Sequence, residues 1–496
     1  MHLRILLLFT LFGCKSLLFS QNVASPSKSD FSGTLSFLAS DWMEGRGATQ
    51  KGGFMASEYI ASMMGLYQLA PYNATDYFQN FKIQEHNVSK AILEIKKGKE
   101  TISLSPKTDF KVTPIAESVQ NETQIVFAGY GLSATNEGYD DYKNQNIKNK
   151  IVVVLKGFPS HQDTLSVTYK KFKKLFPEES NLDEIKLQTA INKGAVALII
   201  IDNKETYKKD KDDSAFHSLE NSEIKTIPIF KISKSAAEKL FLGSKISLEN
   251  FEKKATQKLQ SASILLKNTT VNFSIELKTE SYPVRNILGM IPGKDTTKTV
   301  IIGAHYDHLG IIKDSIYNGA DDNASGTSGM LALAKKWSES NVQPKYNLLF
   351  ASWTAEEMGL LGSEYFVQNF DFSKQKILFA INMDMISRSA PEDKTARILS
   401  IGTEKKDENL RKMASEINVK LQSPFSLDLW ETNGHSGSDY ASFTSKRIPV
   451  MTFFSGFHDD YHTPNDKVSK TDSDKIKDVL FIVNNVLLNF KENQLN

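Results

Sequence analysis

Beyond Thr270 the sequence alternates between short apolar runs of strand character and segments with helical spacing. The runs "KTVIIGAH", "YNLLFASW" and "KILFAINMD" alternate with predicted helices over 325–338 and 359–369. Near-continuous apolar strands separated by helices are typical of an α/β domain, in which a mostly parallel central sheet is covered by helices on both faces. Ligands of such domains bind at the carboxyl ends of the strands. A functional site is therefore expected where these runs end.

The ends of these runs, and two loops before helices, carry His and acidic side chains. Any one of these clusters could be a helix cap or a polar turn, but five of them in one domain indicate a site. The members are His305, Asp307 and His308 in "HYDHLG", Asp321 and Asp322 in "GADDNASG", Glu356 and Glu357 in "TAEEMGLLGS", Asp384 in "NMDM", and His462 in "YHTPNDKV".

These residue types match the requirements of a hydrolytic metal site. Zinc in such sites takes His and carboxylate ligands and keeps one position open for water. Two metals need a bridging carboxylate, and a nearby carboxylate that is not a ligand must accept the proton of the water. The adjacent Glu356 and Glu357 can supply a ligand and a base. The only cysteine is Cys14, so nitrogen and oxygen ligands are expected, for zinc first and for manganese or cobalt as alternatives.

The length of the chain indicates how many domains it has, and its net charge indicates which partners are not expected. A chain of 496 residues favours two domains over one. The chain carries 60 Lys and Arg against 58 Asp and Glu, and Arg4 and Lys15 lie in a predicted leader, so the mature chain is balanced. This balance gives no reason to expect nucleic acid or an anionic membrane as a partner.

The first 21 residues have the pattern of a signal peptide. An early Arg precedes an apolar run over 5–12 that is too short to span a bilayer, and no later segment reaches the length of a membrane span. The sequence therefore predicts an exported protein without a transmembrane segment, periplasmic or extracellular. "LFGC" also permits a lipoprotein reading, in which Cys14 is acylated and anchors the chain.

The remaining chain divides into three predicted parts. Residues 22–87 contain two helical segments joined by the Gly-rich loop "EGRGATQKGG", and 269–496 form the α/β domain. Between them, 88–268 contain short β-like runs, one helix in "DEIKLQTAINKGA" and a charged surface loop, "NKETYKKDKDDS", with no cluster of catalytic residue types. This middle part is predicted to be a separate, β-rich domain without catalytic residues.

The five motifs, in this order and spacing, resemble the co-catalytic di-zinc aminopeptidase family. That family includes bacterial leucyl aminopeptidases and is related to glutamate carboxypeptidase and the transferrin receptor ectodomain. "FLASDWMEGRG" resembles the leading helix and loop of the family. "TQIVFAGYGL" and "KNKIVVVLKG" resemble an inserted protease-associated (PA) domain. Together these segments span nearly all of the mature chain.

The resemblance implies a role for each site residue. His305, Asp322 and Asp384 would hold one zinc, and Asp322, Glu357 and His462 the other, with Asp322 as the bridge between two zinc ions per chain. Glu356 would be the general base. Asp307 would orient His305 through its second ring nitrogen, and His308 would have a structural or pocket-lining part. The family often has a cis peptide after the bridging Asp, here Asp322–Asn323.

The implied reaction is hydrolysis of the N-terminal peptide bond of a peptide with a free N-terminus, by a metal-bridged water with Glu356 as base.

The segment 423–443 is expected to line the side-chain pocket, and Leu429 and Trp430 favour an apolar first residue, whereas Phe425 is expected in the core. Tyr440 and Tyr461 are both candidates to hold the oxyanion. The role of the PA domain and the oligomeric state stay open.

Three alternative functions share this fold. A glutaminyl cyclase uses one zinc, and the complete bridged set argues against it. A carboxypeptidase needs a cationic cluster for the free α-carboxylate, and no arginine cluster is seen near the metal motifs. A binding protein without activity, as in the transferrin receptor ectodomain, requires lost ligands, and here none is missing.

Overall fold

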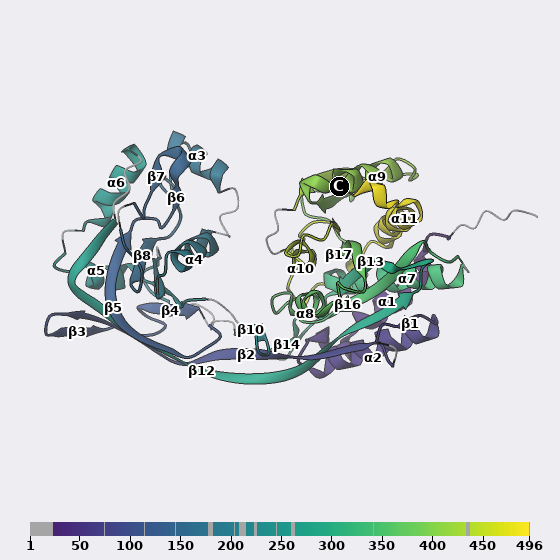
Figure 1. The fold of residues 1–496 in the computed structure, drawn as a ribbon, viewed down its shortest axis with the longest axis horizontal. Helices are drawn as coiled ribbons and strands as arrows, with labels where there is room; N and C mark the ends of the chain where they lie inside the picture. The colour runs from purple at the N-terminus through teal and green to yellow at the C-terminus, as the bar shows by residue number, and fades with distance from the viewer. Residues whose placement is uncertain are drawn as a thin grey trace, which may run out of the picture. The chain divides into compact units, whose positions relative to one another are not determined.

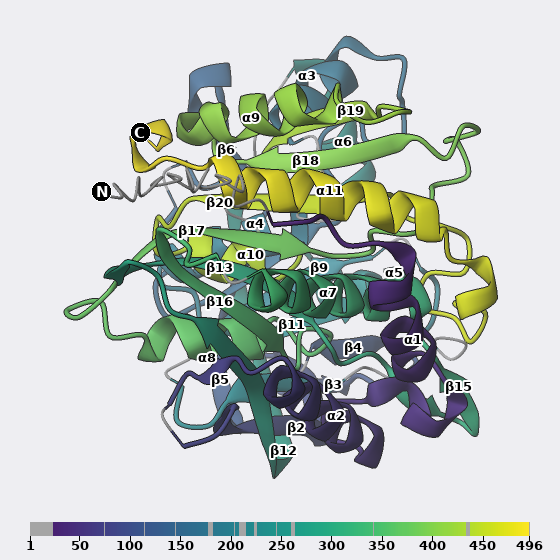
Figure 2. The same ribbon diagram turned by 90° about the vertical axis from the view of Figure 1, so that its right-hand side faces the viewer.

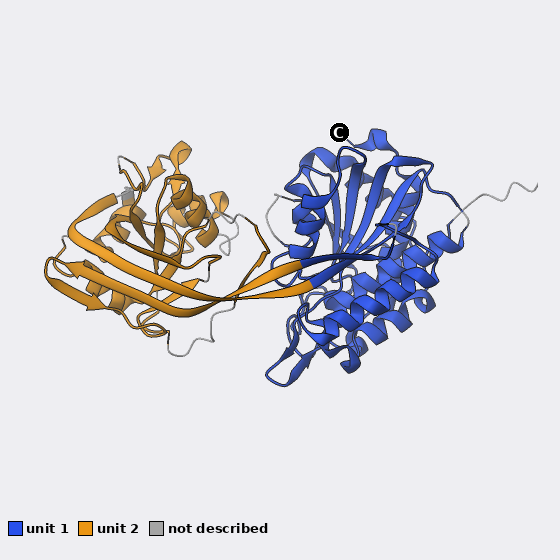
Figure 3. Ribbon diagram, turned by 60° about the horizontal axis from the view of Figure 1, so that its bottom comes forward, with its two compact units in different colours: residues 1–81, 284–496 blue, residues 82–283 orange. Residues whose placement is uncertain are grey.

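The computed structural model describes most of the chain in two compact units. The described residues are 23–73, 75–113, 115–143, 145–176, 182–202, 204–207, 215–222, 226–244, 246–258, 263–340, 342–432 and 437–495. The predicted signal peptide and Cys14 lie outside them. Unit 1 comprises 1–81 and 284–496, and unit 2 comprises 82–283 (Figure 3). The domain limits predicted from the sequence, 88 and 268, remain predictions of domain extent.

Unit 1 is built on a mostly parallel sheet (Figure 1). Its strands are hydrogen-bonded in the order β19-β18-β20-β17-β13-β16-β12. The pairs β18/β19, β17/β20, β13/β17 and β13/β16 are parallel, whereas β18/β20 and β12/β16 are antiparallel. The bounds are β12 Ser263–Ile291, β13 Asp295–His305, β16 Tyr346–Trp353, β17 Lys376–Met383, β18 Ile398–Thr403, β19 Ser426–Glu431 and β20 Val450–Phe454. Short β1, Ala70–Pro71, pairs antiparallel with β12.

The central strands are buried on both faces. All eight residues of β16 are buried, and successive residues of β13 enter different cores. Val300 and Ile302 pack in one hydrophobic cluster, and Ile301 packs in another. This burial explains why the runs are apolar throughout instead of alternating.

Helices cover both faces of this sheet. One cluster joins the sheet to α1 (Lys28–Leu38), α2 (Lys51–Leu66), α7 (Gly326–Glu339), α9 (Glu408–Asn418) and α11 (Ser473–Asn489), and Figure 2 looks onto α7, α9 and α11. The other cluster joins it to α8 (Leu361–Asn369) and α10 (Tyr440–Thr444). The predicted helices over 325–338 and 359–369 are α7 and α8. The predicted fold class, α/β with a mostly parallel sheet between helices, is confirmed.

Unit 2 contains a further run of paired strands and two hydrophobic clusters of its own. The strands β5, β8, β9 and β11 are parallel neighbours, and β4 pairs antiparallel with β11. The bounds are β2 Phe78–Lys97, β3 Glu100–Ser103, β4 Phe110–Thr113, β5 Val119–Ala128, β6 Ser133–Ala134, β7 Tyr139–Asp140, β8 Ile151–Leu155, β9 Ala197–Ile201, β10 Phe216–Leu219 and β11 Ile229–Ile232. Its helices are α3 (Val167–Leu175), α4 (Leu182–Asn192), α5 (Lys234–Phe241) and α6 (Leu248–Lys258). The predicted helix in "DEIKLQTAINKGA" corresponds to α4.

Within the described residues, no helix is both long enough and apolar enough to cross a bilayer.

The close packing of Trp353 against β13 leaves no room for a side chain at Gly303. A Cβ on Gly303 in β13 would lie 2.6 Å from the indole Nε1 of Trp353, a ring held between Phe366 and Phe443. Gly303→Ala is therefore expected to lower the free energy of unfolding by about 1–3 kcal/mol, measured by denaturant unfolding. Gly33→Ala is the matched control. Gly33 is an exposed residue of α1, and a Cβ there would meet nothing within 4 Å. The control should be neutral or stabilising by up to about 1 kcal/mol, and equal losses in both variants would contradict the packing argument.

Candidate metal centre

Three neighbouring strand ends bring the first site residues together. Strand β13 ends at His305, which is in register with Trp353 at the end of parallel β16, shortly before Glu356 and Glu357. On the other side of β13, parallel β17 ends one residue before Asp384. Because parallel strands end at the same edge, these side chains share one site, as the sequence predicts.

His305, Asp322 and Asp384 form a first donor group. His305 Nε2 lies 3.2 Å from Asp384 Oδ1 and 3.4 Å from Asp322 Oδ1. The side chains of His305 and Asp322 are 1% and 5% exposed, whereas Asp384, at 14%, borders a cavity.

Asp322, Glu357 and His462 form a second donor group beside the first. His462 Nε2 lies 3.1 Å from Glu357 Oε2 and 3.2 Å from Asp322 Oδ2. Asp322 thus turns one carboxylate oxygen to each group. That arrangement is the one a bridging ligand requires, and the structure brings together every residue of the two predicted ligand sets.

His308 also belongs to the second group. Its Nδ1 lies 2.6 Å from Glu357 Oε1 and 3.5 Å from Asp322 Oδ2, and its ligand-bearing atoms are within 4.8 Å of the others. The sequence predicted a structural or pocket-lining part for His308, not a place in a donor group. Its spacing of three residues from His305 was the available signal, but spacing in a loop does not tell which way a ring points.

Asp307 contacts His305 in a different way from the one predicted. His305 Nδ1 is 3.1 Å from the backbone carbonyl oxygen of Asp307 and 3.9 Å from its carboxylate. The Asp307 carboxylate accepts the backbone N–H of Glu356 at 3.2 Å instead. One residue therefore orients the ring through its carbonyl and fixes the loop of Glu356 through its side chain.

The loop that carries Asp322 is held by a buried carboxylate from the C-terminal region. Asp466 Oδ2 accepts the backbone N–H groups of Asp321 at 2.9 Å and Asp322 at 3.1 Å. The peptide bond between Asp322 and Asn323 is cis, which confirms the expectation drawn from the resemblance.

The N-terminal loop supplies a buried guanidinium behind the same residues. Arg46 is fully buried, and its donors reach the carbonyl oxygens of Tyr306 at 2.7 Å, Asn318 at 2.6 Å and Gly319 at 2.9 Å. These carbonyls belong to the two loops that carry His305 and Asp322. Arg46 therefore ties both loops to one planar group, and its charge lies near the site.

The carboxylates of the site are electrostatically costly without a cation. Burial raises the pKa of Asp307 to about 7 and that of Glu356 well above its usual range. Burial disfavours the charged ring of His305, but the carboxylates of Glu356 and Asp384 outweigh that effect and raise its pKa. Divalent cations between these groups would reverse both tendencies, because they stabilise carboxylates and neutral imidazoles.

The donor set fits zinc. The ligand atoms are imidazole nitrogens and carboxylate oxygens, which zinc accepts at about 2.0–2.2 Å. Donors at that radius in a tetrahedron lie roughly 3.3 Å apart, and the histidine–carboxylate separations within the two predicted sets run from 3.1 to 3.4 Å. The geometry therefore suits one ion in each group.

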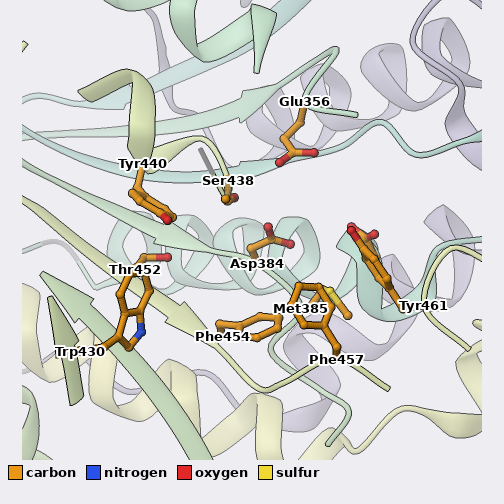
Figure 4. Close-up of a pocket in the computed structure, with 12 residues that line it drawn as sticks. Glu356, Asp384, Met385, Trp430, Ser438, Tyr440, Thr452, Phe454, Phe457 and Tyr461 are labelled. Carbon is orange, nitrogen blue, oxygen red and sulfur yellow. The ribbon is translucent and has the colours of Figure 1, made fainter. Parts of the chain in front are cut away.

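A cavity of about 200 Å³ opens beside the metal centre. Asp322, Glu356 and Asp384 form its acidic part, and the other described lining residues are Met385, Trp430, Gly437, Ser438, Tyr440, Thr452, Phe454, Phe457 and Tyr461. Figure 4 shows Tyr461 on one side of the Asp384 carboxylate and Trp430 with Tyr440 on the other. Of the segment expected to line the pocket, Trp430, Gly437, Ser438 and Tyr440 do so, whereas Leu429 is 44% exposed and Phe425 is in the core.

Comparisons with known proteins agree with this fold and site. Residues 286–487 match the description "Peptidase family M28", and 121–240 match "PA domain". The leupeptin-inactivating enzyme 1 of Streptomyces exfoliatus is 32% identical over 174 residues, which are 34% of this chain and 36% of that protein. The probable leucine aminopeptidase 2 of Aspergillus fumigatus is 28% identical over 194 residues, 38% of this chain and 36% of that protein.

A solved structure resembles the whole chain. The aminopeptidase from Aneurinibacillus sp. strain AM-1 superposes with a TM-score of 0.56 at 20% identity, and the match covers 94% of each chain. At this identity the likeness shows the fold.

The α/β fold and the paired donor groups define a metallopeptidase-type domain. More particularly, residues 286–487 match peptidase family M28, and the stretch that matches a PA domain, 121–240, lies ahead of them in the chain. The resemblance drawn from the five motifs is thereby confirmed. The matched stretch spans 36% of the length of each of the two curated relatives.

Metal removal should expose the repulsion within the site. Chelation of the purified protein is expected to lower the melting temperature of unit 1, because a cation bound only to the folded state stabilises it by about 4 kcal/mol at a thousandfold excess over its Kd. Differential scanning calorimetry with and without chelator, followed by zinc addition, measures the effect. Melting curves that do not respond to chelator or zinc would contradict a metal centre at this site.

Proposed function

We propose that the chain is an exported, zinc-dependent aminopeptidase that hydrolyses the N-terminal peptide bond of peptides. The observation that carries this proposal is the charge of the cavity. Three carboxylates line it, and no Lys or Arg is found among the described residues that line it. The lining offers no cationic side chain to a free α-carboxylate, and Glu356, which lies outside both donor groups, keeps a carboxylate there for a free amine, which argues for an aminopeptidase over a carboxypeptidase.

Two zinc ions per chain complete the proposed site. One would be held by His305, Asp322 and Asp384, and the other by Asp322, Glu357 and His462, with Asp322 as the shared ligand. When bound, zinc lowers the pKa of a coordinated water toward about 7 and polarises a carbonyl group. This ligand assignment is the one that the family resemblance implies, and the histidine–carboxylate separations in this chain support it.

Glu356 is the proposed general base. Its carboxylate lines the cavity but belongs to neither donor group, and its Oε2 lies 4.0 Å from His305 Nε2. It is therefore free to take a proton from the attacking water and to pass it to the leaving amine nitrogen. The hydrogen bond from its backbone N–H to Asp307 keeps the loop in place during both transfers.

Tyr461 is the better candidate for a hydrogen bond to the oxyanion. It lines the cavity, and its ring stacks on His462 with centroids 3.8 Å apart. Burial, followed by the nearby carboxylates of Asp322 and Glu357, raises the pKa of Tyr461 far above 10. The hydroxyl therefore keeps its proton and can donate it in a hydrogen bond as negative charge develops on the carbonyl oxygen.

The apolar wall of the cavity supports an apolar first residue. Trp430 and Tyr440 contact each other with ring centroids 5.9 Å apart, and Phe454, Phe457 and Tyr461 form a continuous row with centroids 4.9 Å apart at each step. Aromatic walls bury an apolar side chain while the acidic end holds the amine.

Export rests on the first 21 residues alone, whose pattern is that of a signal peptide, with lipid anchoring through Cys14 as the variant form. Peptides in the periplasm or outside the cell are the corresponding substrates.

The adjacent glutamates allow a matched test of the mechanism. Glu356→Gln should lower kcat for Leu-p-nitroanilide by about 10²–10⁴-fold while retaining the zinc content of the wild type. Glu357→Gln should lower the zinc content itself, because an amide is a poor zinc ligand. Elemental analysis with steady-state kinetics separates the two. Full activity in Glu356→Gln would remove that residue from the mechanism.

The acidic end of the cavity predicts a requirement for the free amine. N-acetyl-Leu-p-nitroanilide should be hydrolysed at least 100-fold more slowly than Leu-p-nitroanilide, because acetylation removes the positive charge. Leu-, Phe- and Glu-p-nitroanilide compared at equal concentration test the apolar preference, with Glu the slowest. Equal rates on free and acetylated substrates would rule out the aminopeptidase.

A further inference from the structure

The contact between His308 and Glu357 is shorter than every other histidine–carboxylate contact within the two donor groups. Atoms bound to one zinc ion in a tetrahedron are roughly 3.3 Å apart, and the histidine–carboxylate separations within the two three-residue sets are 3.1–3.4 Å. His308 Nδ1 and Glu357 Oε1 are 2.6 Å apart. This distance is short for two ligands of one ion and typical of a charge-assisted hydrogen bond.

We propose that His308 is a positioning residue for the second metal site: its Nδ1–H donates a hydrogen bond to Glu357 Oε1 and leaves Oε2 to face the metal. This inference rests on the proposed function. Oε2 is the oxygen that lies 3.1 Å from His462 Nε2, so the two oxygens of one carboxylate have different partners. A carboxylate fixed in this way has less rotational freedom to lose when a cation binds.

The surroundings of His308 support a role for Nδ1 alone. The residue is 2% exposed, and its Nε2 has no hydrogen-bond partner among the described residues. Burying an imidazole with one unpaired nitrogen is unfavourable, so a merely structural role would be served better by an apolar side chain. The benefit of histidine at this position therefore comes from its contact with Glu357.

Two backbone segments, at Gly319 and at Arg46, contact His308 closely. A Cβ on Gly319 would lie 2.5 Å from ring atoms of His308, and Gly319 has a φ of 54°. The backbone N–H of His308 donates to the carbonyl of Arg46 at 3.3 Å. Arg46 also binds the carbonyl of Gly319 through its guanidinium. The ring is thus held between two segments that a single residue ties together.

The test compares donors of different chemistry at one position. Full-length mature protein is stripped of metal, and zinc is titrated against a chromophoric chelator for the wild type, His308→Ala and His308→Gln. We expect His308→Ala to weaken one of the two zinc constants about 10–100-fold and to leave the other unchanged. His308→Gln, whose amide can donate to Glu357, should recover most of the loss. His217→Ala in unit 2 is the control and should change neither constant.

Cobalt substitution separates positioning from direct ligation. The visible absorption of the cobalt-loaded His308→Gln protein should match that of the wild type, because the ligands are unchanged. Unchanged zinc constants in His308→Ala would overturn the proposal. A Gln variant as weak as Ala, with an altered cobalt spectrum, would also overturn it and make His308 a ligand. Circular dichroism checks that each variant is folded.

The outcome for the proposed function is independent of these results. A wild-type protein that binds two zinc ions but cleaves no aminoacyl-p-nitroanilide would refute the aminopeptidase and leave the role of His308 intact. A wild-type protein that binds no zinc would overturn both.

Discussion

The site depends on the carboxylate of Asp322, because its two oxygens contact both donor groups. Each of its oxygens faces a different donor group, at 3.2–3.5 Å from the histidine nitrogens. A shared carboxylate fixes the distance between two cations only if its own backbone cannot move. The structure provides that rigidity from two directions, through Asp466 on the amide hydrogens and Arg46 on the carbonyl oxygens of the same loop. Small displacements of that loop would disturb both groups at once.

The negative charge of the metal centre is reduced by protonation of carboxylates, by the nearby Arg46 and, when they bind, by metal cations. Carboxylates gathered in a buried space repel one another, and burial already pushes Asp307 and Glu356 toward their neutral forms. Arg46 contributes a positive charge, and its hydrogen bonds to the described residues all go to carbonyl oxygens and none to a carboxylate. Cations contribute the rest when they bind. Glu356 belongs to neither donor group, which is why it is the residue proposed for proton transfer.

The sequence predicted the fold class and the membership of the site, and the reason is physical. Strand ends of a parallel sheet meet at one edge, so the polar residues after each apolar run could be placed together without coordinates. Directions of side chains in loops could not be predicted in this way. His308 was given a structural part, although its ring faces Glu357, and Asp307 contacts His305 through its carbonyl instead of its carboxylate. The role of Arg46 was also missed, because nothing local in "EGRG" indicates that its partners lie some 260 to 276 residues further along the chain.

The separation between Arg46 and its partners has a consequence for the order of folding. During synthesis, α1, α2 and the loop of Arg46 emerge first, but the carbonyls of Tyr306 and Gly319 follow only after all of unit 2 has been made. A buried guanidinium has no stable place until then, so the N-terminal segment must wait in an incomplete state. Unit 2, whose residues are continuous, can fold during that interval. The late arrival of strands β13 and β16 then closes contacts of very high sequence separation, which are slow to form. A translational pause or a chaperone that shields the first 81 residues would therefore favour the peptidase unit far more than the inserted one.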